Sequence, residues 1–164
     1  LEVLTVILGG MMSSRLFTEI REKLGAAYYV RADADLNPDT GCLVAQAGVD
    51  NKKIDKVISA ILSEYKKISQ NKVSARELKK AKENLKGKLA LTLEASDARA
   101  SFFAGQELLE NKILNIEEVF ERIDQVSAND ILKVGRDIFR PKNLNLALIG
   151  PFEDKEKFKR LLKL

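Results

Sequence analysis

Histidine is absent from the 164 residues, and Cys42 is the only cysteine. Without an imidazole, the chain cannot form a Ser-His or Cys-His nucleophile pair and has no His ligand for zinc. A single cysteine cannot form an intrachain disulfide or a thiolate zinc cluster. A metal site built from this chain alone would use carboxylates, which suit magnesium or calcium better than zinc. Carboxylate and lysine chemistry stay open, and most other forms of catalysis by this chain alone are excluded.

Residues 66–88 form the most basic part of the chain. They contain nine Lys or Arg residues and two Glu, a local net charge of +7, whereas the whole chain carries +4. Such a segment could bind nucleic acid or an anionic membrane. No Gly-rich phosphate loop, RNA-binding aromatic motif or zinc finger accompanies it. A solvated helix face is the simpler interpretation, so neither nucleic acid nor a membrane is expected as a partner.

The overall composition is that of an ordinary soluble protein, with 45% hydrophobic and 32% charged residues. The length predicts a single domain over residues 1–164. No signal peptide opens the chain, and no apolar run approaches the roughly 18 residues of a membrane span. The first residue is Leu1, so we expect a piece of a longer polypeptide. The lack of disulfides and of a signal peptide favours a cytoplasmic location.

Helical spacing of apolar residues recurs along most of the chain. Gly9-Gly10 and Gly25 are expected to end the first two helices, Ser13 or Ser14 to cap the second, and Ser74 to form a capping box with Glu77. Ser127 or Asn129 is expected to cap a later helix. The expected helices are Leu1–Leu8, Ser13–Leu24, Ile54–Ile68, Ser74–Leu89, Ser96–Asn111, Ile116–Ile123, Ser127–Phe139 and Glu153–Leu162.

Alternating apolar and polar residues predict strands at 28–36 and 42–49, joined as an antiparallel hairpin by the turn residues 37–41. Asp33 and Asp35 share one strand face; they could bind a cation, although solubility of the hairpin explains them more simply. A third strand is predicted at Leu144–Leu148. Many helices and few strands indicate an α+β fold, an antiparallel or mixed sheet with helices packed on one face. Three strands make a thin sheet, so we expect its first strand to precede Leu1.

Four segments of the sequence resemble one known family. Residues 7–28, which read ILGGMMSSRLFTEIREKLGAAY, are similar to a signature of the C-terminal half of insulinase/pitrilysin-type zinc peptidases, the inverzincins, which include mitochondrial processing peptidase. Residues 74–82 resemble a helix of the same family. Residues 126–131 and 141–151 resemble its closing segments. The similarity extends over essentially the whole chain, and the first block is the most specific.

The resemblance implies a LuxS/mitochondrial processing peptidase-like metallohydrolase fold, with two or more related α+β domains facing each other across a closed chamber. The family's zinc motif, His-x-x-Glu-His, lies in the N-terminal domain. This chain has no histidine, so the resemblance assigns it to the domain that completes the chamber and binds substrate in a zinc-dependent metalloendopeptidase. The implied partners are the His-x-x-Glu-His domain, in the same polypeptide or in a separate subunit, and an extended peptide substrate. An exposed chamber-facing surface would also favour pairing of two copies in a dimer.

Arg21 and Tyr28 occupy the positions that the resemblance assigns to substrate binding. A guanidinium and a phenol can donate hydrogen bonds to the carbonyl oxygens of an extended peptide and to the oxyanion formed during hydrolysis. Two structural alternatives stay open. Arg21 could be a surface residue that interacts with a helix C-terminus. Tyr28 has the same strand parity as Val30 and Ala32, so it could pack in the core.

The family pattern is not followed everywhere. A third Gly often stands where this chain has Met11, and Leu where it has Ala26. Gly9 and Gly10 could let a peptide backbone approach closely, or they could simply stop a helix. Two further functions stay open: a non-catalytic assembly subunit of the same fold, like the core subunits of the respiratory cytochrome complex, and a nucleic-acid binder that uses the basic segment.

Overall fold

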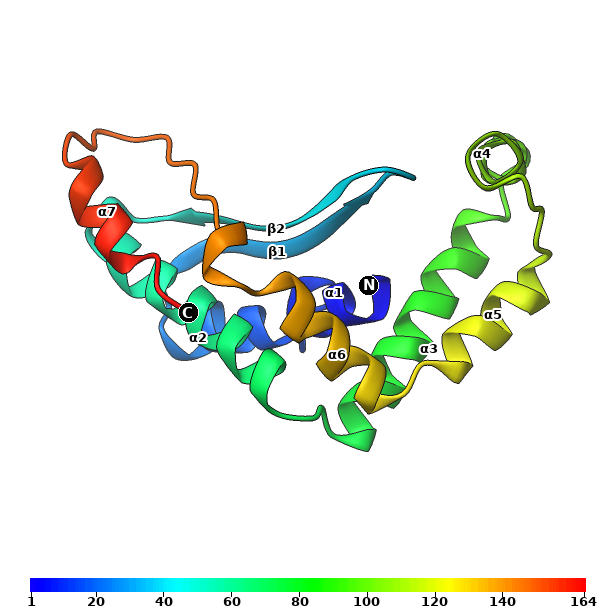
Figure 1. Ribbon diagram of the computed structural model, residues 1–164, viewed down its shortest axis with the longest axis horizontal. Helices are drawn as coiled ribbons and strands as arrows, with labels where there is room; N and C mark the ends of the chain where they lie inside the picture. The colour runs from blue at the N-terminus through cyan, green and yellow to red at the C-terminus, as the bar shows by residue number, and fades with distance from the viewer.

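The computed structural model describes all residues from 1 to 164. A two-stranded antiparallel hairpin lies on one side of the molecule, and helices α1 (Glu2–Gly9), α2 (Ile54–Gln70) and α6 (Ala128–Ile138) lie beneath it (Figure 1). A core of 23 buried residues lies between these layers and includes five residues of α1, a helix in which seven of the eight residues are buried. The α+β class and the placement of helices on one face of the sheet are therefore confirmed.

The hairpin consists of β1 (Ala27–Leu36) and β2 (Gly41–Val49). Their register pairs Val30 with Ala47 and Ala32 with Ala45, and it shifts between Ala27 and Tyr29. Val30 and Ala32 are buried, whereas Arg31 and Asp33 are exposed, as the alternation predicts. A backbone hydrogen bond of 3.0 Å from the Asn37 nitrogen to the Thr40 oxygen closes the predicted turn.

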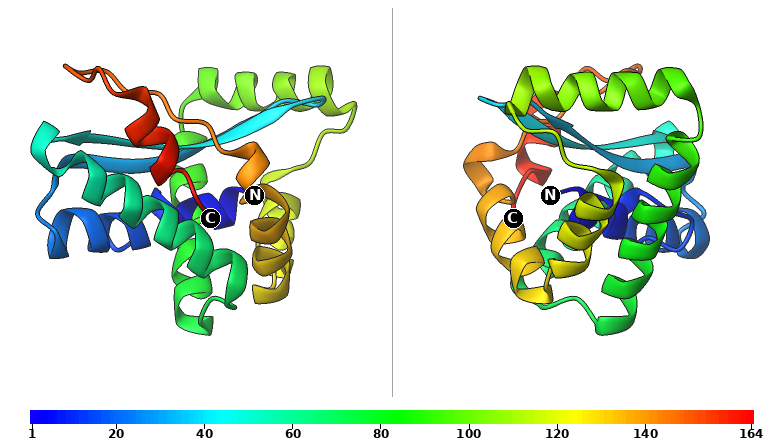
Figure 2. Two further views of the ribbon diagram at one scale, coloured as in Figure 1. Left: turned by 60° about the vertical axis from the view of Figure 1, so that its left-hand side comes forward. Right: turned by 90° about the vertical axis from the view of Figure 1, so that its right-hand side faces the viewer.

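Three helices form an arm that extends from this core. They are α3 (Ala75–Thr92), α4 (Ser96–Glu110) and α5 (Ile116–Gln125), and α4 stands apart from the hairpin in Figure 1. Figure 2 shows the same three helices from two further sides. Gln106 is the one buried residue of α4, and its side chain joins this helix to the segment that precedes α5. It accepts a hydrogen bond from the backbone nitrogen of Leu114 at 2.9 Å and donates one to the carbonyl oxygen of Leu114 at 3.3 Å.

The predicted third strand is wrong. The sheet contains only β1 and β2, and residues 144–149 form an irregular segment between the short 3-10 helix Pro141–Asn143 and α7 (Lys155–Leu161). Leu144 and Leu148 are half-buried against the core, which accounts for the apolar alternation. Because this segment has no hydrogen-bonded partner strand, the alternation marks a half-buried extended stretch and not a ladder.

Two of the predicted helix caps also differ from the structure. Ser74 accepts a hydrogen bond from the Glu77 nitrogen, but the Glu77 carboxylate pairs with Arg15 and therefore does not complete the capping box. Ser14 is buried, and its hydroxyl has no hydrogen-bond partner, so it caps nothing. Ser127 does form a complete capping box, with Asp130.

The burial of Tyr65 in α2 lets us predict how the stability of the domain changes with pH. Its ring stacks on Phe139 with centroids 4.2 Å apart, and burial raises the pKa of its phenol to about 12, from an ordinary value of 10.0. Between pH 10 and 12 the unfolded chain releases this proton while the folded chain keeps it, so stability falls as pH rises. We expect the free energy of unfolding to fall by up to about 1.4 kcal/mol per pH unit from this group.

Urea unfolding of the wild type and of Tyr65→Phe at a series of pH values above 9 measures this contribution, because the lysines titrate alike in both proteins. The loss of stability should be shallower in Tyr65→Phe. Tyr29→Phe, which removes the hydroxyl of a half-exposed tyrosine, is the matched control and should follow the wild type. Parallel curves for the wild type and Tyr65→Phe would contradict the assignment.

Candidate functional site

Arg21 lies on an unusual helical turn. Residues Phe17–Lys23 form a π-helix, in which the Leu24 nitrogen donates to the Glu19 oxygen at 3.1 Å, and Gly25 with a φ of 51° ends the turn as predicted. π-helical turns occur frequently at functional sites. The Arg21 side chain is exposed, and its guanidinium carbon lies 5.0 Å from the centroid of the Phe17 ring.

The ion pair on the same turn joins Lys23 to Glu19 and does not include Arg21. Lys23 Nζ lies 2.8 Å from Glu19 Oε2, and this hydrogen bond raises the pKa of Lys23 and lowers that of Glu19. Arg21 and Lys23 both lie in the last turn of the π-helix, so the predicted interaction of Arg21 with a helix C-terminus fits the geometry. That interaction does not remove the guanidinium from solvent, and Arg21 stays accessible to a ligand.

Tyr28 is not a core residue. Its side chain is 89% exposed, although Val30 and Ala32 of the same parity are buried. The reason is the register shift between Ala27 and Tyr29, an irregularity of the β-bulge kind that leaves Tyr28 without a partner on β2. A bulge changes the direction of a side chain relative to the strand pattern. The structural alternative that Tyr28 packs in the core is therefore wrong, and its phenol faces solvent.

A surface hollow of about 430 Å³ lies beside Tyr28, at the start of β1 and the end of β2. Lys53 Nζ donates a 2.9 Å hydrogen bond to the carbonyl oxygen of Gly25 and so ties the connection between Arg21 and Tyr28 to the chain that follows β2. No hydrogen bond joins Arg21 to Tyr28, and Arg21 does not line the hollow. The hollow is lined by Gly25, Ala26, Ala27, Tyr28, Gly48, Val49, Asp50 and Lys53.

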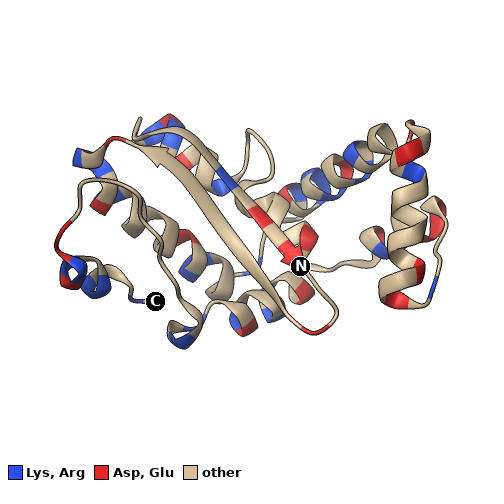
Figure 3. Cartoon of the chain, turned by 90° about the horizontal axis from the view of Figure 1, so that it is seen from above, with Lys and Arg blue, Asp and Glu red and all other residues tan.

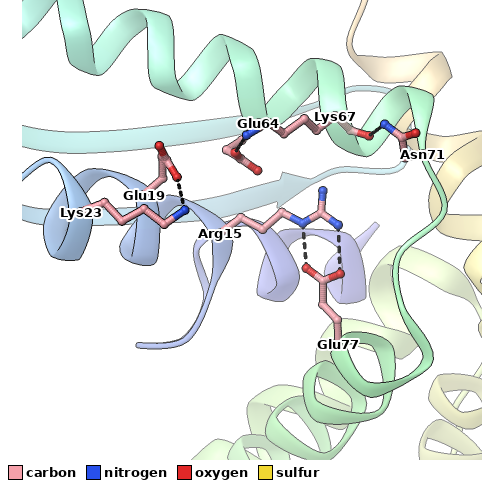
Figure 4. A network of polar contacts seen from close by, with 7 residues as sticks. All are labelled: Arg15, Glu19, Lys23, Glu64, Lys67, Asn71 and Glu77. Atoms are coloured by element: carbon pink, nitrogen blue, oxygen red, sulfur yellow. Dashed lines mark hydrogen bonds and ion pairs between the residues drawn. The ribbon is translucent and has the colours of Figure 1, made fainter.

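A network of ion pairs anchors the segment that leads into the π-helix (Figure 4). Arg15 donates to both carboxylate oxygens of Glu77, from Nε at 2.7 Å and from Nη2 at 2.9 Å, and this bond raises the pKa of Arg15. Glu64, which is buried, pairs with Lys67 at 2.5 Å. Sequence reasoning did not single out Arg15. The only signal was its place in the family-like block, because its partner lies 62 residues away.

Gly9 serves packing and not a ligand. A Cβ atom at Gly9 would lie 2.3 Å from the Ala32 nitrogen and 2.7 Å from the Ala32 Cβ, so this glycine lets α1 lie directly against β1. The hypothesis that Gly9 admits a peptide backbone is therefore wrong. α1 ends at Gly9 as predicted, and the cap residue Gly10 is right-handed, with a φ of −85°.

Several lysines of the basic segment make ion pairs or hydrogen bonds within the chain. Lys86 pairs with Asp124 and Glu83, Lys82 donates to the Asp124 carbonyl oxygen, and Lys88 donates to the Gly10 carbonyl oxygen. In Figure 3, which colours Lys and Arg blue, blue segments recur along α3. Several of the lysines therefore hold α3 against its neighbours, which supports the structural interpretation of the segment over nucleic-acid binding.

The chain does not provide a zinc site. No group of three or more His, Cys, Asp or Glu side chains could hold a metal ion, and the residues that zinc prefers amount to the single exposed Cys42. The chemistry of the available donors therefore does not fit zinc. A cavity of about 650 Å³ between the start of α1 and helices α3 to α6 is lined by neither Arg21 nor Tyr28. None of the helices combines the length and the low polarity that crossing a membrane requires.

Comparison of the sequence with known proteins identifies the family of this chain. Residues 1–85 match the model described as the peptidase M16 inactive domain. A Bacillus subtilis protein named uncharacterized zinc protease YmxG is 31% identical over 149 residues, which are 91% of this chain and 36% of the relative. The chain therefore spans about a third of the length of the curated relatives that it matches.

Solved structures agree with the sequence comparison. A conserved protein from Enterococcus faecalis has a TM-score of 0.72 at 30% identity, over 82% of this chain and 31% of that one. A chain of Complex III2 from Candida albicans has a TM-score of 0.74 at 25% identity, over 83% of this chain and 34% of that one. The match over more than half of the residues shows that this chain is a peptidase-related, non-catalytic domain and belongs to the family of the peptidase M16 inactive domain.

Proposed function

We propose that this chain is the substrate-binding, chamber-completing domain of a zinc-dependent metalloendopeptidase, and that Arg21 and Tyr28 bind the backbone of an extended peptide. The observation that carries the proposal is the exposure of Tyr28. The register shift at the start of β1 takes this phenol out of the strand pattern and leaves it 89% exposed beside a hollow, where its ring gains little from hydrophobic burial. The exposed Arg21 lies one short connection away.

The two side chains supply complementary hydrogen-bond donors. A guanidinium has five N–H donors and a phenol has one hydroxyl donor, so both suit peptide carbonyl oxygens and the oxyanion that develops at the scissile carbon. The zinc and the water that it activates would come from a His-x-x-Glu-His domain, because this chain lacks the ligands. The names of the relatives as zinc proteases and their greater length support a catalytic partner domain in the same polypeptide or in a second subunit.

The proposal is tested by peptide hydrolysis with the full-length protein. Arg21→Ala and Tyr28→Phe should each lower kcat/KM by about tenfold or more, because each removes a hydrogen bond to a developing or full charge. Chelation of zinc should abolish hydrolysis. The isolated 164-residue chain should be inactive and should regain activity only with the zinc-bearing part.

Two neighbouring residues provide matched controls. Arg31 is an exposed arginine on β1 that is held by Gln46 and Asp33, and Tyr29 is the adjacent half-exposed tyrosine. Arg31→Ala and Tyr29→Phe should leave kcat/KM within about twofold of the wild type. Equal losses in the controls and in the Arg21 and Tyr28 variants, or hydrolysis by the isolated chain, would overturn the proposal.

A second candidate function rests on the likeness to a chain of Complex III2 from Candida albicans. On this hypothesis the domain uses its faces only for assembly and hydrolyses nothing in any context. The full-length protein separates the two functions, because metal-dependent peptide hydrolysis that needs Arg21 excludes a purely structural role. A protein that forms a stable complex but cleaves no peptide, with or without zinc, favours assembly.

A further inference from the structure

Phe17 contacts the guanidinium of Arg21 without being one of the predicted binding residues. The Arg21 Cζ lies 5.0 Å from the centroid of the Phe17 ring, within the range of a cation–π contact. The Phe17 ring is half-buried and packs against the hydrophobic core, so its position is set by the interior of the domain. The flexible Arg21 side chain therefore lies against a ring that is fixed by its packing in the core.

The kind of contact matters for binding. A carboxylate partner would occupy the N–H donors of Arg21, whereas the face of an aromatic ring attracts the cation without acting as a carbonyl-type acceptor. Glu19, two residues before Arg21, is paired with Lys23 instead, and no ion pair or side-chain hydrogen bond joins Arg21 to the adjacent Glu22. Arg21 is thus oriented by Phe17 while its hydrogen-bond donors stay available. A side chain that is already ordered loses less conformational entropy when a ligand binds.

We infer that Phe17 is a positioning residue, which holds the Arg21 guanidinium in its peptide-binding orientation through the face of its ring; this inference rests on the proposed function of Arg21. The role belongs to the ground-state complex as much as to the transition state, because Arg21 is oriented before the peptide arrives. Loss of the ring should therefore weaken peptide binding and have little effect on the chemical step.

The test is a double-mutant cycle in the full-length enzyme, with KM and kcat measured for an extended peptide. Phe17→Leu keeps an apolar side chain against the core but removes the ring. It should raise KM by about threefold to tenfold and leave kcat within twofold. Phe17→Tyr keeps the ring and should restore the KM of the wild type. In an Arg21→Ala background, Phe17→Leu should have no further effect on KM.

The controls distinguish positioning from general damage. Ile20→Val trims a fully buried residue of the same π-helix and should lower stability without changing KM. Phe17→Met replaces Phe17→Leu if the latter does not fold. If Arg21→Ala raises KM but loss of the Phe17 ring does not, or does so equally without Arg21, the positioning role is wrong and the proposed function stands. If Arg21→Ala has no effect, both fall.

Discussion

Replacement of Gly9 by alanine is expected to destabilise the domain by about 3 kcal/mol or more, the upper end of the cost of overpacking. The added Cβ would lie 2.3 Å from the Ala32 nitrogen and 2.8 Å from the Arg31 carbonyl carbon. These are backbone atoms of a paired strand, and α1 on the other side is almost entirely buried, so neither element can yield at low cost. Relief requires α1 to move away from β1, which opens the core.

Chemical denaturation of Gly9→Ala against the wild type measures this effect, and Gly87→Ala is its matched control. Gly87 lies within α3, and a Cβ there would meet nothing within 4 Å. The same chemical change should therefore stabilise the domain by about 0.5 to 1 kcal/mol, because alanine is the better helix former. Similar behaviour of the two variants would show that close packing of α1 on β1 is not what selects glycine at position 9.

Replacement of Glu77 by alanine is expected to cost about 2 kcal/mol, because it leaves Arg15 without its partner in a partly buried position. The side chains are 19% and 25% exposed, and both oxygens of Glu77 accept from the guanidinium. The pair joins the segment before the π-helix to the first turn of α3. Its loss should therefore also loosen the turn that carries Arg21.

The Glu156–Lys159 pair of α7 is a suitable control for Glu77→Ala. Its side chains are 68% and 69% exposed, so Glu156→Ala should change the free energy of unfolding by less than about 0.5 kcal/mol. The double variant Arg15→Met/Glu77→Leu removes both charges and should recover most of the stability lost in Glu77→Ala. A double variant no more stable than Glu77→Ala would show that the ion pair itself, and not the unpaired charge, decides the effect.

Local patterns predicted the secondary structure well where a single segment decides it. The hairpin, the long α2 and the helices of the arm follow from apolar periodicity and from turn residues near in sequence. The third strand failed because alternation reports one buried side and not a hydrogen-bonded neighbour. Only half of the predicted capping box at Ser74 forms, because Arg15, which is 62 positions away, pairs with the Glu77 carboxylate.

For the candidate site, the sequence supplied the identities of Arg21 and Tyr28 through a family resemblance, and the comparisons confirm the family. Their roles in substrate binding remain predictions. The sequence did not show that Tyr28 leaves the core, since strand parity predicted the opposite. A bulge depends on how two strands pair, so the sequence pattern of residues 27–36 alone does not predict the register shift at Tyr28.

Composition by itself determined that this chain cannot provide the histidine ligands of a zinc peptidase, because the sequence contains no histidine whatever its fold. Periodicity determined the helices and the hairpin, because those depend on neighbouring residues. Only the tertiary structure decided that Tyr28 faces solvent, that Gly9 serves packing and that Arg15 pairs with Glu77. Each of these features depends on contacts between residues that are far apart in the sequence. Strand register and helix packing determine which of those residues meet, and local sequence patterns do not contain that information.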